Sequence, residues 1–181
     1  MPKKSLYVLI AAALGALAAS SEAARSEAGA TARQGVVRCG GNHHLRLSGT
    51  EVHFTHYALR NFDASTAIVI DRIRVFDGPG SVVFDSAIGG LPVSENGLLG
   101  PGNNVLAPNQ SALIDSHEMV PAYLPDVRRP LQLEVEWSAP TRALSLDAIT
   151  VRISHGRNAT TGQMLEERGR HAVECRSISL K

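Results

Sequence analysis

The sequence has few aromatic residues, little net charge and only two cysteines. Aromatic residues make up 4% of the chain, and the basic residues are scattered along it. Proteins that bind single strands or sugars stack them on clustered aromatic rings, and the sequence contains no such cluster. The formal net charge is +1, so no global field attracts nucleic acid or an anionic membrane. The sequence therefore predicts no nucleic-acid partner.

Long apolar runs are also lacking, except for one close to the N-terminus. Lys3 and Lys4 precede the apolar stretch 6–19, which is 14 residues long. A helix that crosses the hydrocarbon core of a bilayer needs about 20 residues. A positive start, a short apolar core and small residues after it are typical of a cleaved secretory signal. We therefore predict a signal peptide over residues 1–24, cleaved after Ala18 or Ala23; an N-terminal membrane anchor is the alternative.

The rest of the chain has the size of one domain. Residues 25–35 are small and polar, without a periodic apolar face, and are expected to form a flexible tether. Residues 36–181 are predicted to form a single domain, which is long enough to enclose an apolar core. No stretch of this part is apolar enough to span a bilayer, so no membrane span is expected after signal cleavage.

The two cysteines, Cys39 and Cys175, lie near opposite ends of the predicted domain. In an oxidising compartment an isolated pair forms a disulfide more often than a metal site. A redox-active pair usually has a close spacing such as Cys-x-x-Cys, which this pair lacks. The sequence therefore predicts a structural disulfide and, together with the leader, a periplasmic or secreted bacterial protein.

Alternating apolar and polar residues predict β-strands along the domain. In residues 131–137 every odd position is apolar and every even position is polar, the period of a strand with one wet face. The turn cluster 77–81 separates two β-branched runs, which predicts a hairpin. Strands are expected over 52–60, 67–76, 82–84, 111–115, 131–137, 149–154 and within 164–180.

The apolar pattern of residues 52–60 changes phase. Val52 and Phe54 occupy even positions, whereas Tyr57 and Leu59 occupy odd ones. An extra residue in one strand shifts the phase in this way, so the pattern predicts a bulge after His56.

Asp71 interrupts another apolar run. Strict alternation places it on the core side with Val69 and Ile73. A buried carboxylate is costly unless it is paired. We therefore expect a structural ion pair with Arg60, Arg72 or Arg168; a binding role for Asp71 is the alternative.

Six to eight short strands, without a convincing amphipathic helix, predict an all-β fold. The spacing favours an antiparallel two-sheet sandwich, immunoglobulin-like in the broad sense, and leaves the strand order open. Residues 86–104 contain seven glycines or prolines among polar residues and predict a long loop.

Several short motifs occur in a characteristic order. They are Leu-Arg-Asn-Phe-Asp at 59–63, Ile-Asp-Arg-Ile-Arg-Val-Phe-Asp at 70–77, Leu-Ala-Pro at 106–108, Leu-Glu-Val-Glu-Trp at 133–137, Ile-Thr-Val at 149–151 and Glu-Arg-Gly-Arg at 167–170. This order resembles a family of uncharacterised exported bacterial proteins with a β-sandwich-like domain of unknown function. The resemblance covers about residues 50–173. Residues 86–104 resemble an insertion relative to that family. The resemblance implies a fold and an exported location, and it implies no site.

Histidines are the first candidates for a metal site. His43, His44, His53 and His56 lie close together in the sequence, and imidazoles bind Zn or Cu. On a regular strand, however, His53 and His56 point to opposite faces. We therefore predict solvent-facing histidines and no metal site; a periplasmic metal-binding protein that uses these four histidines is the alternative function.

Residues 115–118, Asp-Ser-His-Glu, contain the residue types of a hydrolase triad. Adjacent residues cannot take the three roles, because the base must reach the nucleophile while a third group orients it from behind. No nucleophile elbow or phosphate-binding loop occurs elsewhere. The sequence therefore predicts no catalytic residues and no cofactor, and an enzyme assembled from distant residues is a third hypothesis.

The leading functional hypothesis is a non-catalytic exported module that binds a protein or envelope component through its loops. Residues 86–104 motivate it, because Leu91, Val93, Leu98 and Leu99 occur there among glycines. Long loops on a rigid sandwich often carry binding. A solvated insertion without a role is the alternative.

Exported, folded protein should show no titratable thiol until reductant is added, because both cysteines are expected in the disulfide. Thiol titration in denaturant, with a reduced sample as positive control, measures this. A bridge across so long a loop stabilises by up to about 5 kcal/mol in the chain-entropy model. Two titratable thiols in folded, exported protein would contradict the prediction.

Overall fold

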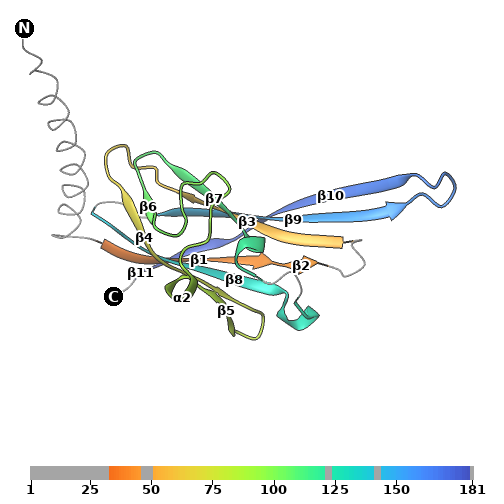
Figure 1. The fold of residues 1–181 in the computed structure, drawn as a ribbon, viewed down its shortest axis with the longest axis horizontal. Coiled ribbons are helices and arrows are strands. Elements are labelled where there is room, and N and C mark those ends of the chain that lie inside the picture. The colour runs from red at the N-terminus through yellow and green to blue at the C-terminus, as the bar shows by residue number, and fades with distance from the viewer. Residues whose placement is uncertain (1–32, 46–50, 121–123, 141–143, 180–181) are drawn as a thin grey trace, which may run out of the picture. The chain divides into compact units, whose positions relative to one another are not determined.

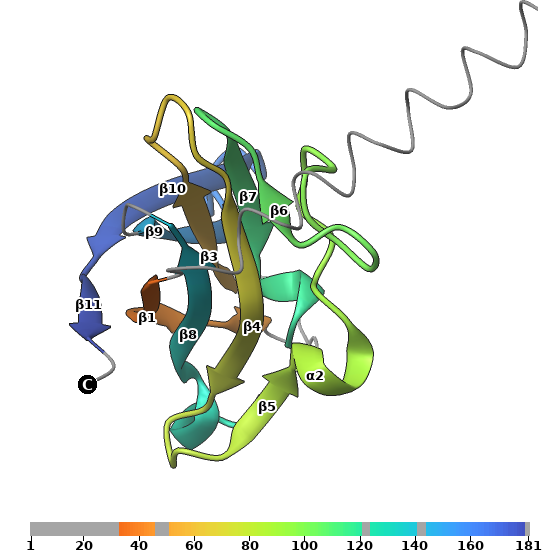
Figure 2. The same cartoon turned by 90° about the vertical axis from the view of Figure 1, so that its left-hand side faces the viewer.

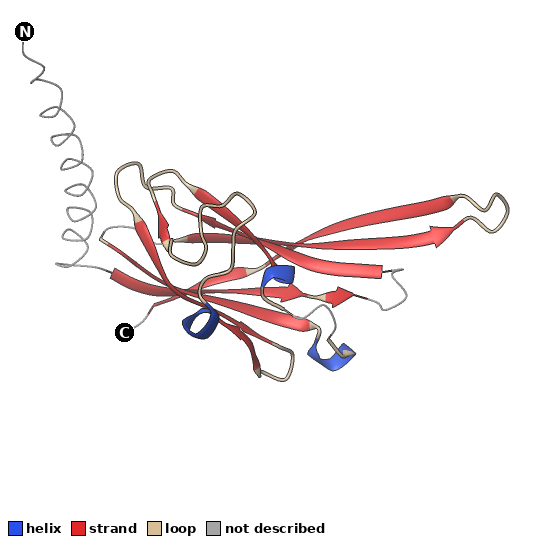
Figure 3. Cartoon of the chain, viewed as in Figure 1, coloured by secondary structure: helices blue, strands red, loops and turns tan. Residues whose placement is uncertain are grey.

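The computed structural model describes residues 33–45, 51–120, 124–140 and 144–179, and most of the regular elements there are strands (Figure 1, Figure 3). The predicted signal peptide and tether residues 25–32 lie outside the described residues. No helix in the described ranges is long and apolar enough to cross a membrane. The elements are β1 (Arg33–Asn42), β2 (His44–Leu45), β3 (Glu51–Arg60), β4 (Ile68–Phe76), β5 (Val82–Asp85), α2 (Ser86–Gly89), β6 (Val105–Leu106), β7 (Ser111–Asp115), the 3₁₀ turns η1 (Ser116–Glu118) and η2 (Asp126–Arg128), β8 (Pro130–Ala139), β9 (Ser145–Arg157), β10 (Met164–Val173) and β11 (Cys175–Ser179).

These strands form two antiparallel sheets packed against each other (Figure 2). Sheet A has six strands in the order β11-β1-β8-β4-β5, and β6 also pairs with β4. Sheet B has five strands in the order β10-β9-β3-β2, and β7 also pairs with β3. The predicted all-β, two-sheet sandwich is confirmed.

The core lies between the sheets and is built from alternating residues. Leu131, Leu133 and Val135 of β8 are buried, in agreement with the predicted alternation of 131–137. Sheet B contributes the buried side chains of Tyr57 and Leu59. Burying a large apolar side chain stabilises by about 1.5–3 kcal/mol relative to leaving it exposed, so this layer supplies the main driving force for packing.

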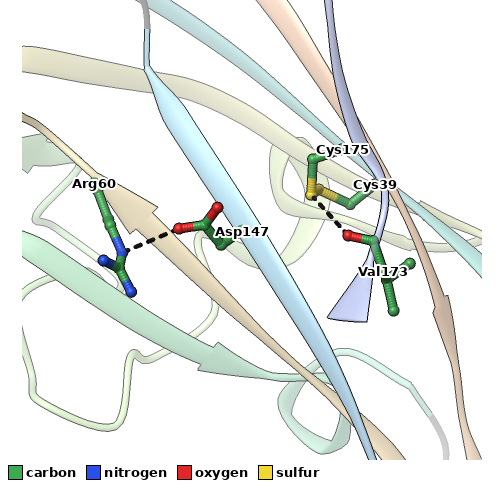
Figure 4. Close-up of a disulfide and its surroundings, with 5 residues drawn as sticks. All are labelled: Cys39, Arg60, Asp147, Val173 and Cys175. Atoms are coloured by element: carbon green, nitrogen blue, oxygen red, sulfur yellow. Dashed lines mark hydrogen bonds and ion pairs between the residues drawn. A yellow bond between two sulfur atoms is a disulfide. The ribbon is translucent and has the colours of Figure 1, made fainter. Parts of the chain in front are cut away.

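One open side of the sandwich is closed by the C-terminal strands. β10 of sheet B leads through Glu174 into β11 of sheet A. Cys175 of β11 is bonded to Cys39 of β1 (Figure 4). The two residues are register partners with Cα atoms 4.1 Å apart, although 136 residues separate them in the sequence. The predicted disulfide is confirmed, and it joins neighbouring strands of one sheet.

The opposite side is closed by residues 86–104, which we call the bridging segment. The Glu95 N–H donates to the Leu113 carbonyl of β7 at 2.8 Å. The Ile70 N–H of β4 donates to the Asn104 carbonyl, also at 2.8 Å. The bridging segment therefore connects the β7 edge of sheet B with the β4 edge of sheet A, on the side of the sandwich away from β10 and β11 (Figure 2).

The leucines of the bridging segment pack in or against the core, unlike those of a loop whose apolar side chains contact a partner. Leu99 is 1% exposed and belongs to the core, and Leu91 and Leu98 pack against it. Val93 is 52% exposed. Of the four apolar residues that motivated a binding role for this segment, the three leucines fill the gap between the two sheet edges, and Val93 is left at the surface.

Strand β1 begins within the predicted tether. Arg33, Gln34 and Gly35 pair with the last residues of β8. A Cβ atom at position 35 would lie 2.4 Å from the indole ring of Trp137. Glycine is therefore required there by close packing, and residues 33–35 of the predicted tether belong to strand β1.

The bulge predicted after His56 is absent from β3. This strand pairs with β9 from Glu51 to Arg60 without a shift in register. Tyr57 and Leu59 face the core, while Val52 and Phe54 are half-buried on the outer face of sheet B. The change of phase in the sequence marks a change of the covered face, so that prediction is wrong.

A bulge occurs instead in β4. Its register against β8 shifts between Ile70 and Arg72, so Asp71 is the extra residue. Ile70 faces the core before the shift and Ile73 after it. Asp71 is exposed, and its predicted burial is wrong because alternation does not continue through a bulge. The three arginines expected near it pair elsewhere: Arg60 with Asp147 (Figure 4), Arg72 with Asp85 and Arg168 with Glu166.

A buried carboxylate does lie on the outer face of sheet A. Glu134 of β8 has a side chain that is 2% exposed, and Arg38 of β1 and Arg74 of β4 bind it from both sides. Arg74 also lies 2.7 Å from Glu136. Hydrogen bonds and opposite charges from two strands compensate the cost of burial. This cluster joins three neighbouring strands on the face that alternation predicts to be polar.

Leu99→Ala should lower the free energy of unfolding by about 2–5 kcal/mol, because it removes a buried side chain from the core. Val93→Ala, at a half-exposed position six residues before Leu99 in the same segment, is the matched control and should change the free energy of unfolding by less than about 0.5 kcal/mol. Urea unfolding followed by circular dichroism measures both. Equal, small effects would show that the bridging segment does not belong to the core.

Candidate functional site

A shallow cleft of about 280 Å³ lies between the bridging segment and β4. Between its pairings with β5 and β6, β4 has no strand partner on this side. The Asn104 amide donates to the Ile70 carbonyl at 3.2 Å, and the Ser86 hydroxyl accepts from the Ile73 N–H at 2.8 Å. Side chains of the bridging segment therefore take the hydrogen bonds that a neighbouring strand would make, and they leave a hollow beside Asp71.

Asp71, the extra residue of the bulge, is one of the residues that line this cleft. Its Oδ1 accepts a hydrogen bond from the Ser138 hydroxyl at 3.2 Å. Partial burial raises the pKa of the Asp71 carboxyl, and nearby Glu136 adds to the rise, while the Ser138 hydrogen bond opposes it. Asp71 and the neighbouring amide side chains of Asn103 and Asn104 offer hydrogen-bond acceptors and donors to a polar ligand. The cleft is smaller than the pockets of about 300–1,000 Å³ that usually hold small ligands and cofactors.

A wider hollow of about 540 Å³ lies over β1, β8 and β11. Charged side chains around it already have partners: Arg176 lies 2.8 Å from Glu174, and Arg38 lies 2.5 Å from Glu134. These pairs already neutralise the charges around the hollow, which leaves less charge for a ligand to complement. The cleft beside Asp71 is therefore the better candidate for binding.

The four histidines of the alternative metal hypothesis do not converge on one point. His44 and His53 are register partners with ring centroids 5.6 Å apart. His56 lies on the opposite face of β3 from His53, as alternation predicts. His43 and His44 are both buried, so the prediction that the histidines face solvent is wrong for these two; the His43 Nδ1 lies 3.1 Å from the Ser116 Oγ.

The triad-like residues Asp115–Glu118 are separated by the end of β7. Ser116 is fully buried, and its Oγ accepts from the Thr55 N–H at 3.0 Å. The His117 Nδ1 lies 2.9 Å from the Asp115 Oδ1, and its ring packs against that of His43. A nucleophile must be reachable by substrate. Ser116 therefore does not combine with His117 and Asp115 in a hydrolase site.

A group of potential metal ligands surrounds His56. Its Nδ1 lies 3.1 Å from the Glu95 Oε1 and 3.5 Å from the Asp115 Oδ2. His56 of β3 and Asp115 of β7 are register partners, and Glu95 comes from the bridging segment. Sequence reasoning missed this group, because the strand pairing that joins β3 to β7 is not visible in a local pattern.

His117 holds the Asp115 carboxylate in place. Its backbone N–H donates to the Asp115 Oδ1 at 2.8 Å, and its ring Nδ1 contacts the same oxygen. Burial acts to raise the pKa of the Asp115 carboxyl, but the hydrogen bonds and charge of His117 outweigh it, so the pKa lies below its usual value. The hydrogen bond to Asp115 raises the pKa of the His117 imidazole. The second oxygen, Oδ2, is left facing His56.

Comparisons with known proteins give little further information. No protein-family model matches the chain, and no curated protein sequence matches it significantly. The crystal structure of Thermotoga maritima 1070 resembles it with a TM-score of 0.36 and 12% identity, over 80% of this chain and 94% of that one. A likeness this distant carries no argument about function. The resemblance to exported bacterial proteins remains a prediction.

Asp71→Ala should change the free energy of unfolding by less than about 0.5 kcal/mol, because its exposed carboxylate makes one hydrogen bond on a bulge. Glu134→Ala is the contrasting variant and should destabilise by about 1–3 kcal/mol, because it removes a buried group bound by two arginines. Chemical denaturation of both variants measures this. A large loss with Asp71→Ala would show that the carboxylate has a structural partner.

Proposed function

We propose that the chain is an exported, non-catalytic β-sandwich module that binds a protein or envelope component at the cleft beside Asp71. One observation carries the proposal: the bridging segment and the β4 bulge line the same cleft. Bulges are frequent next to functional sites, where they redirect a side chain. Here the bulge presents a carboxylate to a segment that resembles an insertion.

Apolar residues at the surface of the bridging segment support binding of a macromolecule. Ile88 on α2 is 90% exposed, and Val93 is half exposed. Protein interfaces combine apolar anchors with polar groups that fix orientation. The cleft with Asp71 and Asn104 supplies the polar part, and Ile88 and Val93 supply apolar contacts on the same segment.

The disulfide supports export to the periplasm or the medium. Bonds such as Cys39–Cys175 persist in oxidising compartments and are rare in the cytosol. The signal peptide predicted over residues 1–24 agrees with this location.

The composition of the cleft supports a non-catalytic role. Among the described residues that line it, Asp71 is the one titratable side chain. General acid–base or nucleophilic catalysis usually requires a second group within hydrogen-bond reach. Ser86 and Asn104 bond to the backbone of β4, which holds the cleft in shape, and neither side chain is titratable.

A photoreactive amino acid tests the proposal in intact cells. Ile88→p-benzoylphenylalanine and Val93→p-benzoylphenylalanine should each give cross-linked adducts of defined mass on irradiation. The same replacement at Thr160, exposed in the hairpin turn between β9 and β10 that projects away from the sandwich, is the matched control and should give none (Figure 1). Adding Asp71→Ala to the Val93 variant should reduce the adduct yield.

Two results would contradict the proposal. The first is the lack of adducts at positions 88 and 93 in protein that is exported and oxidised. The second is an equal yield of the same adducts from position 160, which would indicate random collision.

A further inference from the structure

We propose that His56, Glu95 and Asp115 form a binding site for one divalent transition-metal ion, with Zn²⁺ as the representative of the class. The site lies where β3, β7 and the bridging segment meet. It is separate from the cleft beside Asp71, and the proposal does not depend on the function proposed above.

The spacing of the donor atoms matches the geometry of a small coordination sphere. In a four-coordinate zinc site, nitrogen and oxygen ligands lie about 2.0–2.2 Å from the ion, so neighbouring ligand atoms lie about 3.3–3.6 Å apart. The His56 Nδ1 lies 3.1 Å from the Glu95 Oε1 and 3.5 Å from the Asp115 Oδ2. All three donor atoms lie within 4.8 Å of one another. An ion fits among them after small side-chain rotations, with water as a fourth ligand.

The types of donor favour a borderline transition metal. An imidazole nitrogen suits Zn, Ni, Co and related ions, whereas Ca²⁺ and Mg²⁺ prefer sites made entirely of oxygen. No thiolate or thioether belongs to the group, so soft Cu(I) is a poor match. One nitrogen and two carboxylates also neutralise the charge of a divalent ion.

A hydrogen bond from the His56 ring compensates the two carboxylates less completely than a metal ion would. The imidazole carries at most one hydrogen on Nδ1, so His56 donates to one carboxylate at a time. Glu95 and Asp115 then face each other as two close negative charges with a single hydrogen bond between them and the ring. A divalent ion contacts all three donors at once.

The protein holds the ligands in place without the ion. The Glu95 N–H is bonded to the Leu113 carbonyl of β7, which fixes the backbone beside the site. Asp115 is oriented by His117, and ligating carboxylates commonly have such supporting hydrogen bonds. The Phe54 ring packs edge-on against His56, with centroids 4.9 Å apart.

Two other histidine–carboxylate pairs differ from this site, because an arginine binds the carboxylate of each pair. Glu51, next to His53, lies 2.9 Å from the Arg152 Nε, and Glu166, near His155, is bound by Arg168. In both pairs a guanidinium neutralises the carboxylate and binds one of its oxygens. In the described part of the chain, no ion pair joins Glu95 or Asp115 to an arginine.

Calorimetric titration of the purified chain, without a polyhistidine tag, tests the site with Zn²⁺ and Co²⁺. The wild type should bind one ion per chain, and bound Co²⁺ should show the intense visible absorption of a four-coordinate ion. His56→Ala, Glu95→Gln and Asp115→Asn should each abolish binding. His117→Gln should weaken it by about 10–100-fold, because it removes a group that orients a ligand.

Two variants serve as matched controls. His53→Ala and Glu166→Gln alter histidine–carboxylate pairs outside the site and should leave binding unchanged. Circular dichroism verifies that every variant is folded, and Glu95→Gln changes an exposed side chain of nearly the same shape. The proposal is overturned if the wild type gives no heat and no Co²⁺ spectrum. Retained binding in folded Glu95→Gln and Asp115→Asn, or lost binding in His53→Ala, would also overturn it.

Discussion

Mutual burial of two apolar sheet faces is the constraint on which the rest of this structure depends. Each sheet hides the inward side chains of the other, but a sandwich of flat layers leaves two sides open to water. One side is closed where β10 continues into β11 and a disulfide ties β11 to β1. The other is closed by the bridging segment. The C-terminal strands and the bridging segment therefore serve the same requirement, each on one side of the sandwich.

The bridging segment shows how closure and a candidate site arise together. Leu99 fills the core, Glu95 reaches His56 on sheet B, and Asn104 bonds to β4 on sheet A. Because the bridging segment runs from the edge of one sheet to the edge of the other, its side chains lie close to side chains of both edges. The cleft and the metal-ligand group are thus consequences of one connection.

The local pattern of apolar and polar residues was sufficient to predict much of the fold. The alternation in 131–137 and the separation of Cys39 from Cys175 gave β8 and the disulfide, because a strand's period and an isolated cysteine pair are properties of the sequence itself. A shift of apolar phase was ambiguous. In β3 it reflects a partly covered outer face, and in β4 it reflects a bulge at Asp71. Only the register with the neighbouring strand distinguishes these cases.

The candidate metal site could not be predicted from local sequence patterns, because it too depends on how the strands pair. His56 was visible as a potential ligand, but its partners depend on pairing between β3 and β7 and on the path of the bridging segment. Neither Glu95 nor Asp115 stands at a spacing from His56 that any local motif would mark. The histidines that were close in sequence, such as His53, were carried to another face by the strand's own alternation.

The position of β1 has a consequence for how the polypeptide is made. It leaves the ribosome early, yet the strands on its two sides, β8 and β11, are among the last to emerge. Until then the backbone groups of β1 lack their partners in sheet A, so this sheet cannot be completed early in synthesis. Because Cys175 belongs to β11, its bond with Cys39 can form in the native register only after these two distant segments have come together.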